Sequence, residues 1–204
     1  MNTPTHIAEL LLKEKAVFLR PEDPFTWTSG IKSPIYCDNR ILISAVESRT
    51  HVIKAFCEKI KSYQADYIAG TATAGIPWAA WIADHMKLPL VYVRSSSKEH
   101  GRQNAIEGRI PEGARAILIE DLISTGKSSV AAAQRLQEQK VEVPVVLSIF
   151  SYNLPVAQKA FSDAQLKYDS LSTFEVLAQV AYDQKMLNEA SLNQVLEWRK
   201  SVTL

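Results

Sequence analysis

Apolar residues recur along the chain in two spacings, which predict alternating helices and strands. Ile7, Leu10 to Leu12, and Val17 with Phe18 follow helical spacing, so we expect an amphipathic helix over residues 5–19 that ends before Pro21 and Pro24. Further helices are expected at 44–63, 75–86, 126–139, 155–163, 173–182 and 188–199. Strands are expected at 67–70, 90–93, 116–119 and 143–150, with a weaker strand at Tyr168.

The order of these segments predicts the fold class. Strands alternate with helices from residue 67 onward, and the run at 143–150 is apolar almost throughout, as in a parallel strand buried on both faces. Before this alternation, residues 25–30 and 33–38 are expected to form two short strands joined across Gly30 and Pro34. We therefore predict one doubly wound α/β domain over residues 1–204, with a mainly parallel sheet and a small N-terminal cap, residues 1–40.

Composition and charge narrow the class of protein. The formal net charge is +1, which gives no reason to expect a nucleic-acid ligand. The two cysteines, Cys37 and Cys57, fit neither a metal-binding spacing nor a disulfide framework, so a reduced, cytoplasmic setting is expected. No secretory signal is evident at the N-terminus, and no apolar run approaches the ~18 residues that a membrane span needs.

The stretch from Ala116 to Ser129 carries the densest chemistry. An apolar run ends in the adjacent carboxylates Glu120 and Asp121, and a Ser-Thr-Gly turn then leads into a helix. Ligands of open α/β sheets bind at such strand ends, and the free N–H groups of the loop suit a phosphate. The carboxylates suit hydroxyl groups or a magnesium-bound ligand. The competing interpretation is a polar turn with a good helix cap.

The sequence argues against a Walker A loop, which binds nucleoside triphosphates, at this turn. Gly126-Lys127-Ser128 resembles its end, but the glycine required five residues before Gly126 is Asp121. A carboxylate at that position would repel the phosphates that such a loop wraps.

Two other loops could bind anions. Gly70 and Gly75 enclose only small residues after a short strand, so the backbone there can approach a ligand closely. The segment 94–109 contains four Arg or Lys and two Glu, a charge of +2, and its length and polarity suit a lid over a polyanion. The alternative for the first loop is an ordinary connection between a strand and a helix without a ligand. The alternative for the second is a solvated surface loop.

Taken together, these motifs resemble the type I phosphoribosyltransferases. Residues 117–129 are similar to that family's phosphoribosyl pyrophosphate signature. Residues 24–40, residues 93–101 and Ile106-Glu107-Gly108 are similar to motifs of its orotate-using branch. The matching motifs cover roughly residues 24–130. The resemblance implies transfer of ribose 5-phosphate from phosphoribosyl pyrophosphate to orotate, with residues 1–40 as a hood over the base site.

The resemblance also implies residue roles. Lys98, His100, Glu120 and Asp121 would be catalytic. Phosphoribosyl pyrophosphate would contact Arg94, Lys98, His100, Thr71, Ala72, Thr73, Ala74, Gly75, Glu120, Asp121, Leu122, Ile123, Ser124, Thr125, Gly126, Lys127 and Ser128. Orotate would lie near Ser33, Pro34, Ile35, Tyr36, Arg40 and Ser124. Magnesium would be the cofactor, held mainly through substrate with no direct protein ligand. The chain would form a homodimer that shares the 94–108 loop between subunits.

The chain departs from the family pattern in ways that leave alternatives open. Some members carry Lys where this chain has Thr28, Ala74 and Ser95, and an arginine where Ser151-Tyr152 stands. These losses leave the partner of the orotate carboxylate open, and Arg40 is our hypothesis. Lys127 either reaches the phosphate or points to solvent. A phosphoribosyltransferase for another nucleobase, or a regulator that binds phosphoribosyl pyrophosphate without chemistry, remain the alternative functions.

Overall fold

A computed structural model describes residues 3–27, 30–95 and 105–202. Its centre is a six-stranded sheet in the order β10-β9-β8-β5-β6-β7. These strands are β10 (Tyr168–Thr173), β9 (Val146–Ser151), β8 (Ala116–Ile123), β5 (Tyr67–Thr71), β6 (Leu90–Val93) and β7 (Ile106–Glu107). All pairs are parallel except β6 with β7. The predicted mainly parallel α/β fold is confirmed.

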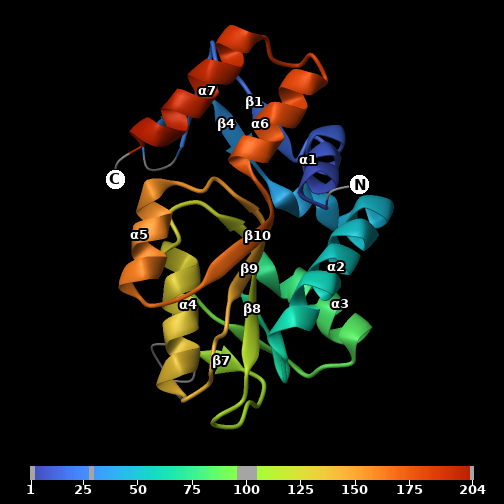
Figure 1. Cartoon of the computed structure of the whole chain (residues 1–204). Coiled ribbons are helices and arrows are strands. Elements are labelled where there is room, and N and C mark those ends of the chain that lie inside the picture. Colours follow the sequence, from blue (N-terminus) through green and yellow to red (C-terminus); the bar gives the residue numbers. More distant parts are fainter. Residues whose placement is uncertain (1–2, 28–29, 96–104, 203–204) are drawn as a thin grey trace.

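Helices cover both faces of this sheet, as Figure 1 shows. On one side lie α4 (Lys127–Glu138) and α5 (Pro155–Asp163), and on the other α2 (Val46–Ile60) and α3 (Gly75–Met86). Along β8, Leu118 belongs to the core on the α4 side, whereas Ile117 and Ile119 pack with Trp78 of α3. Because successive strand residues face opposite sides, a strand covered on both faces has to be apolar throughout.

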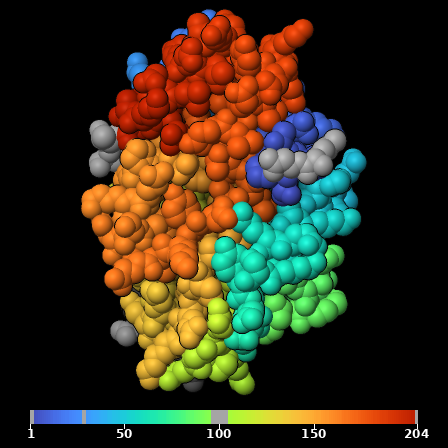
Figure 2. Space-filling model, in the orientation of Figure 1, coloured from blue at the N-terminus to red at the C-terminus, as the bar shows by residue number. Residues whose placement is uncertain are grey.

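The hood is built from both ends of the chain. Its N-terminal elements are α1 (Thr3–Lys13), β1 (Val17–Leu19), β2 (Phe25–Thr26), β3 (Lys32–Ser33), β4 (Ile35–Cys37) and the 3₁₀ helix η1 (Asn39–Ile43). The C-terminal helices α6 (Phe174–Asp183) and α7 (Glu189–Ser201) pack beside them (Figure 1). Figure 2 shows α1, in dark blue, on the surface between α6 and α2. Trp198 of α7 donates its indole N–H to the Lys32 carbonyl oxygen at 2.8 Å.

The first helix is shorter than predicted. It ends at Lys13, Lys15 adopts a left-handed φ of 54°, and Val17–Leu19 then form β1. The apolar pair Val17-Phe18 fits either period, and here the antiparallel pairing of β1 with β4 decides the conformation. The pairing predicted for 25–30 with 33–38 is confirmed only in part: β2 pairs with β3 across Gly30, but β4 pairs with β1.

Smaller differences concern element ends. The helix predicted at 44–63 is α2, which begins at Val46 and is followed by the 3₁₀ turn η2 (Lys61–Tyr63). The strand predicted at 143–150 begins at Val146, two residues after Pro144. The segment 94–109, predicted as a polar lid, contains the short edge strand β7. Within the described ranges, every helix is too short or too polar to cross a membrane.

Candidate functional site

The two predicted carboxylates lie at the carboxyl end of β8, in the centre of the sheet. Glu120 is buried, with 4% of its surface exposed, and its carboxylate accepts hydrogen bonds from the Ser129 hydroxyl at 3.1 Å and the Asp121 N–H at 3.2 Å. Asp121 is half-buried. One acid is therefore enclosed by the protein, while the other keeps a path to a ligand.

Burial and mutual repulsion perturb both acids. Burial is the larger cause and the charge of Asp121 the second, and together they raise the pKa of Glu120 to about 8. Burial also raises the pKa of Asp121, while hydrogen bonds from Glu120 and from backbone N–H groups oppose that rise. The two acids titrate as a coupled pair, and the raised pKa of Glu120 keeps this buried acid largely protonated at neutral pH. A strand end with a half-buried acid beside a protonated one is poised to bind hydroxyl groups.

The turn after β8 has the geometry of an anion-binding loop. Gly126 adopts a φ of 78° and precedes the first residue of α4, and a Cβ added to it would lie 3.0 Å from the Phe161 ring. Ser124 and Thr125 are half-buried, whereas Lys127 and Ser128 are exposed on the first turn of α4. The N–H groups of this turn and the helix N-terminus therefore offer the donors that a phosphate requires.

The glycine-flanked loop lies beside the same strand end. A Cβ on Gly75 would lie well inside van der Waals contact with the Ile119 carbonyl oxygen, so only glycine lets the N-terminus of α3 approach β8 this closely. The Ala72–Thr73 peptide is cis, and the Ala72 N–H binds the Val93 carbonyl oxygen at 2.8 Å. At the end of β5, the buried Thr71 hydroxyl has no hydrogen-bond partner among the residues that the structure describes. An unpaired hydroxyl at a strand end is one that a ligand can satisfy.

A cavity of about 380 Å³ separates the hood from the β8–α4 turn. Its lining comes from three regions of the chain: Thr26, Trp27, Tyr36 and Cys37 of the hood, Leu122, Ser124 and Thr125 after the acidic pair, and Tyr152 after β9. The Trp27 and Tyr152 rings are stacked with centroids 5.1 Å apart. None of these side chains carries a charge while the Cys37 thiol and the two phenols, Tyr36 and Tyr152, are protonated. Burial raises the pKa of both Cys37 and Tyr152 well above their usual ranges. The cavity suits a flat ring rather than a second phosphate.

The residues predicted for the base site divide into two groups. Tyr36 and Ser124 line the cavity, whereas Ser33, Pro34 and Ile35 are buried and do not. Ser33 uses its hydroxyl within the hood, where it donates to the Ile35 carbonyl oxygen at 2.8 Å.

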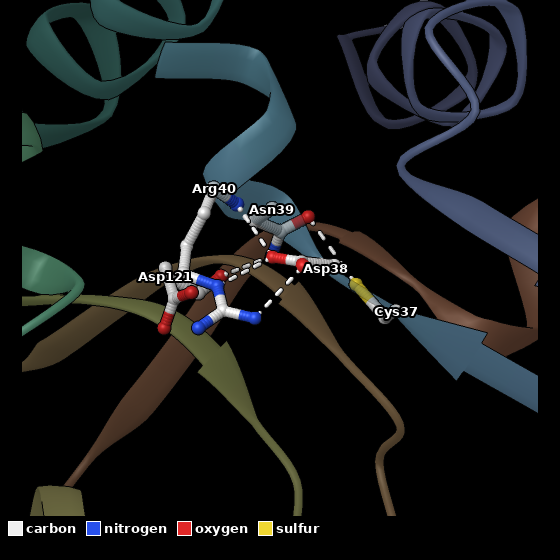
Figure 3. A network of polar contacts seen from close by, with 5 residues as sticks. All are labelled: Cys37, Asp38, Asn39, Arg40 and Asp121. Carbon is white, nitrogen blue, oxygen red and sulfur yellow. Dashed lines mark hydrogen bonds and ion pairs between the residues drawn. The ribbon is translucent and has the colours of Figure 1, made fainter.

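Arg40 also lies outside the cavity lining. It is exposed, and its guanidinium binds both carboxylate oxygens of Asp38 at 2.7 and 2.8 Å (Figure 3). The guanidinium hydrogen bonds hold the pKa of Asp38 below its usual range. Arg40 therefore already has an anionic partner in this structure.

The start of the predicted lid is held by a residue that sequence reasoning did not find. Arg135 of α4 donates to the carbonyl oxygens of Arg94 and of Ser95, the latter at 2.9 Å. The Arg94 guanidinium lies 3.6 Å from the Glu107 carboxylate, across the β6–β7 pair. Lys98 and His100 fall outside the described residues. Arg135 and Glu107 thus hold the first residues of this segment at the end of β6.

Three further residues of the site went unpredicted. Trp27 and Asn39 stood within the hood motif but had no assigned role, and Tyr152 was noted only as a departure from the family pattern. The sequence signal that could have indicated Tyr152 was its position directly after the buried strand β9, which lies adjacent to β8. Asn39 donates to the Asp121 backbone at 2.7 Å, a contact between residues far apart in sequence. In the described ranges, no cluster of three or more His, Cys, Asp or Glu is arranged to hold a metal.

Comparisons with known proteins agree with this geometry. The phosphoribosyl transferase domain family matches residues 44–185. The orotate phosphoribosyltransferase of Coxiella burnetii is 52% identical over 202 residues, covering 98% of this chain and 97% of that protein. Among solved structures, the orotate phosphoribosyltransferase from Aeropyrum pernix has a TM-score of 0.75 at 25% identity, covering 89% of this chain and 99% of that one. The UMP synthase of Leishmania donovani has a TM-score of 0.81 at 24% identity, covering 97% of this chain and 42% of that one, a likeness of fold.

Proposed function

The chain belongs to the orotate phosphoribosyltransferase family, and we propose that it transfers ribose 5-phosphate from phosphoribosyl pyrophosphate to orotate. In this reaction the bond between the anomeric carbon and pyrophosphate breaks and a bond to a ring nitrogen of orotate forms. The ring N–H proton is released, and the products are orotidine 5′-monophosphate and pyrophosphate. Cleavage develops positive charge on the ribose and negative charge on the leaving group, so catalysis requires groups that stabilise both.

The end of β8 supports the binding of ribose 5-phosphate. The Asp121 carboxylate accepts hydrogen bonds from ribose hydroxyls, and Glu120 supports it from the buried side. The turn from Ser124 to Ser128 binds the 5-phosphate through its N–H groups. Lys127 stands exposed on this turn, where its ammonium can add a charge contact to the phosphate.

The loop from Thr71 to Gly75 and the lid support the binding of pyrophosphate. The Thr71 hydroxyl, unpaired among the described residues, lies at the end of β5, and Arg94 directly follows its partner Val93 on the neighbouring strand β6. Lys98 and His100 close over the leaving group. Magnesium suits this pyrophosphate, and with no carboxylate cluster arranged for it in the described residues it would be held mainly by substrate oxygens. When bound, magnesium neutralises the charge that leaves with pyrophosphate.

Orotate occupies the cavity between the hood and the β8–α4 turn. The stacked rings of Trp27 and Tyr152 form an apolar wall, and Tyr36, Ser124 and Thr125 add hydroxyl groups. The cavity volume of about 380 Å³ is of the size that small ligands require. The cavity, lying directly beside the acidic strand end, is the observation that carries the proposal.

An ultraviolet assay tests this function. Purified protein mixed with orotate, phosphoribosyl pyrophosphate and magnesium is expected to consume orotate and release an equal amount of pyrophosphate. Uracil, adenine and hypoxanthine in place of orotate serve as controls for a different base preference. Consumption of another base with orotate untouched would contradict the substrate, and ligand binding without any product would favour a regulator.

A homodimer completes the site in our proposal, with the 94–108 loop of each subunit closing over its neighbour. The test mixes Lys98→Ala with Asp121→Asn protein after subunit exchange. Each hybrid dimer then carries one intact site, so activity is expected to return to about a quarter of the wild-type value by random pairing. Exchange without recovery would place the loop over its own subunit.

We infer a cytoplasmic location. Cys37 and Cys57 are both buried free thiols, which fits a reducing compartment. Fractionation of cells that express the tagged protein, with activity recovered in the cytosolic fraction, is the expected result.

A further inference from the structure

Asn39 joins the hood to the acidic end of β8. Its side-chain Nδ2 donates to the backbone carbonyl oxygen of Asp121 at 2.7 Å, and the residue is only 1% exposed. The pairing of β5 with β8 ends at Gly70 opposite Ile119, so Asp121 lies beyond the last partner that β5 provides. Asn39 therefore supplies a hydrogen-bond donor to a carbonyl at a point where the neighbouring strand has already ended.

The orientation of this amide is fixed from its other end. The Cys37 thiol donates to Asn39 Oδ1 at 3.2 Å, so a flipped amide would present NH₂ to the thiol and oxygen to the Asp121 carbonyl oxygen. Burial first, and then the charges of Asp121 and Asp38, raise the pKa of this thiol well above its usual range. The S–H donor thus persists at physiological pH, and the amide keeps one orientation.

The backbone around Asn39 is held as well. Asn39 is the first residue of η1, and the carboxylate of Asp38 caps this helix by accepting from the Arg40 N–H at 3.1 Å. The Arg40 guanidinium grips the same carboxylate in a bidentate pair (Figure 3). Exposed pairs add little stability on their own, but a bidentate pair fixes geometry. The Asp38–Arg40 pair is therefore part of the frame that presents Asn39 to β8.

We propose that Asn39 is a positioning residue for the transfer reaction: through the Asp121 carbonyl it holds the Asp121 carboxylate at a fixed distance from the base cavity. The same short segment provides Tyr36 and Cys37 to that cavity, so one rigid element sets the position of both substrates' contacts. This inference rests on the proposed function, because it assigns Asp121 to the ribose hydroxyls. Asn39 itself touches neither substrate.

The first test is Asn39→Ala. A displacement of a reacting group by ~1 Å can cost ~10²-fold in rate, so we expect turnover to fall by about tenfold to a hundredfold. The KM for orotate is expected to change by less than about threefold, because a loss realised in the transition state lowers kcat rather than ground-state binding. A role confined to hood folding would instead raise that KM or lower the fraction of folded protein.

Asn39→Asp adds a readout that a folding role cannot imitate. The isosteric carboxylate turns the donor into an acceptor facing the Asp121 carbonyl oxygen, so turnover at pH 8.5 is expected to fall below that of Asn39→Ala. Once protonated, the same side chain can donate again, so the ratio of variant to wild-type turnover is expected to rise as the pH falls toward 6. The ionisable and charged groups around this site are Asp38, which caps η1, Arg40 of η1, Cys37 of β4, Glu120 and Asp121 of β8, and Tyr152 after β9. Since the wild type contains them all, taking the ratio removes their own titration.

Three further variants keep the test decisive. Asn188→Ala removes an asparagine that caps α7 by accepting from the Ser191 N–H at 2.8 Å, away from β8. It should lower the melting temperature and leave turnover unchanged. If Asn39→Ala does not fold, Cys37→Ala and Cys37→Ser replace it: serine keeps the donor to Asn39 Oδ1, so it should retain more turnover than alanine.

The outcomes separate this inference from the proposed function. If the wild type makes no orotidine 5′-monophosphate, the proposed function fails. With an active wild type, an Asn39→Ala protein that is folded and turns over at the wild-type rate overturns the positioning role. An Asn39→Asp ratio that does not change with pH, or equal turnover of the two Cys37 variants, also overturns it.

Discussion

The two halves of the candidate site are built in opposite ways. The ribose-phosphate half comes from one continuous stretch, in which β8 ends in Glu120 and Asp121 and leads through Gly126 into α4. The base half is assembled from the hood, the β8–α4 turn and Tyr152, which follows β9. Within the hood, the ring of Trp198 on α7 packs edge-on against the Trp27 ring, with the two ring centroids 5.8 Å apart. The first half is local in sequence and rigid by strand pairing, whereas the second depends on contacts between distant segments. A substitution in the first should therefore disturb chemistry, and one at an aromatic ring that lines the second should disturb binding.

Asp121→Asn should give the largest effect. It removes the accessible negative charge at the strand end, while the amide keeps nearly the shape of the carboxylate. Turnover is therefore expected to fall ~10²–10³-fold, the usual cost of a lost preorganised contact. Asp66→Asn is the matched control, because Asp66 accepts from the Arg115 N–H at 2.9 Å at the opposite end of β8. Steady-state kinetics of both variants tests this prediction. Equal turnover of the two variants would mean that Asp121 has no role in the reaction.

Gly75→Ala should be next in size. The new Cβ would press on the Ile119 carbonyl oxygen and force α3 away from β8, carrying the Thr71–Gly75 loop with it. Overpacking of this kind costs ~1–3 kcal/mol, which is several degrees in melting temperature for a chain of this length. Turnover is expected to fall by about tenfold or more, measured with saturating orotate.

Gly113→Ala is its control. The backbone of Gly113 has a φ of 78°, so alanine is strained there, yet nothing lies within 4 Å of the added Cβ. It should therefore lose some stability without losing turnover. If both alanine variants kept full activity, the close approach of α3 to β8 would have no part in catalysis.

The difference between the halves also explains what the sequence could reveal. The βα rhythm, the acidic pair and the small-residue turn were predictable, because a buried strand and a helix start each leave a local pattern. The core helices at 75–86 and 155–163 were predicted to the residue for the same reason.

The hood was less predictable, since its conformation depends on pairing rather than on periodicity. The spacing of Val17-Phe18 fits a helix, but these residues form a strand because they pair with β4. The contact of Asn39 with Asp121 spans 82 residues, and the place of Tyr152 in the cavity depends on the strand order. Neither has a local signature. The role of Arg40 toward the orotate carboxylate stays a prediction, with Asp38 as its present partner.

Trp27→Ala tests the base half. It removes the ring that stacks on Tyr152 and the indole N–H that donates to the Ile35 carbonyl oxygen at 3.2 Å. We expect the KM for orotate to rise about tenfold, since an aromatic contact together with its buried area contributes on the order of 1–2 kcal/mol. The KM for phosphoribosyl pyrophosphate should change little. Trp81→Ala, on α3 away from the cavity, is the control for loss of an indole.

Glu120→Gln should have the smallest effect on turnover, because the amide resembles the protonated acid that predominates at neutral pH. Its effect on stability is expected to depend on pH. The pKa of Glu120 is raised in the folded state to about 8 from an ordinary 4.5, so the wild type loses stability as the pH rises through that window. The glutamine variant has no such titration. In thermal unfolding, the melting temperature of the variant should therefore rise relative to that of the wild type between pH 5 and pH 9. The shift corresponds to about 2–4 °C for each kcal/mol of stability. A difference that stays constant with pH would mean that the buried acid ionises freely, and the strand end would then carry two full charges before substrate binds.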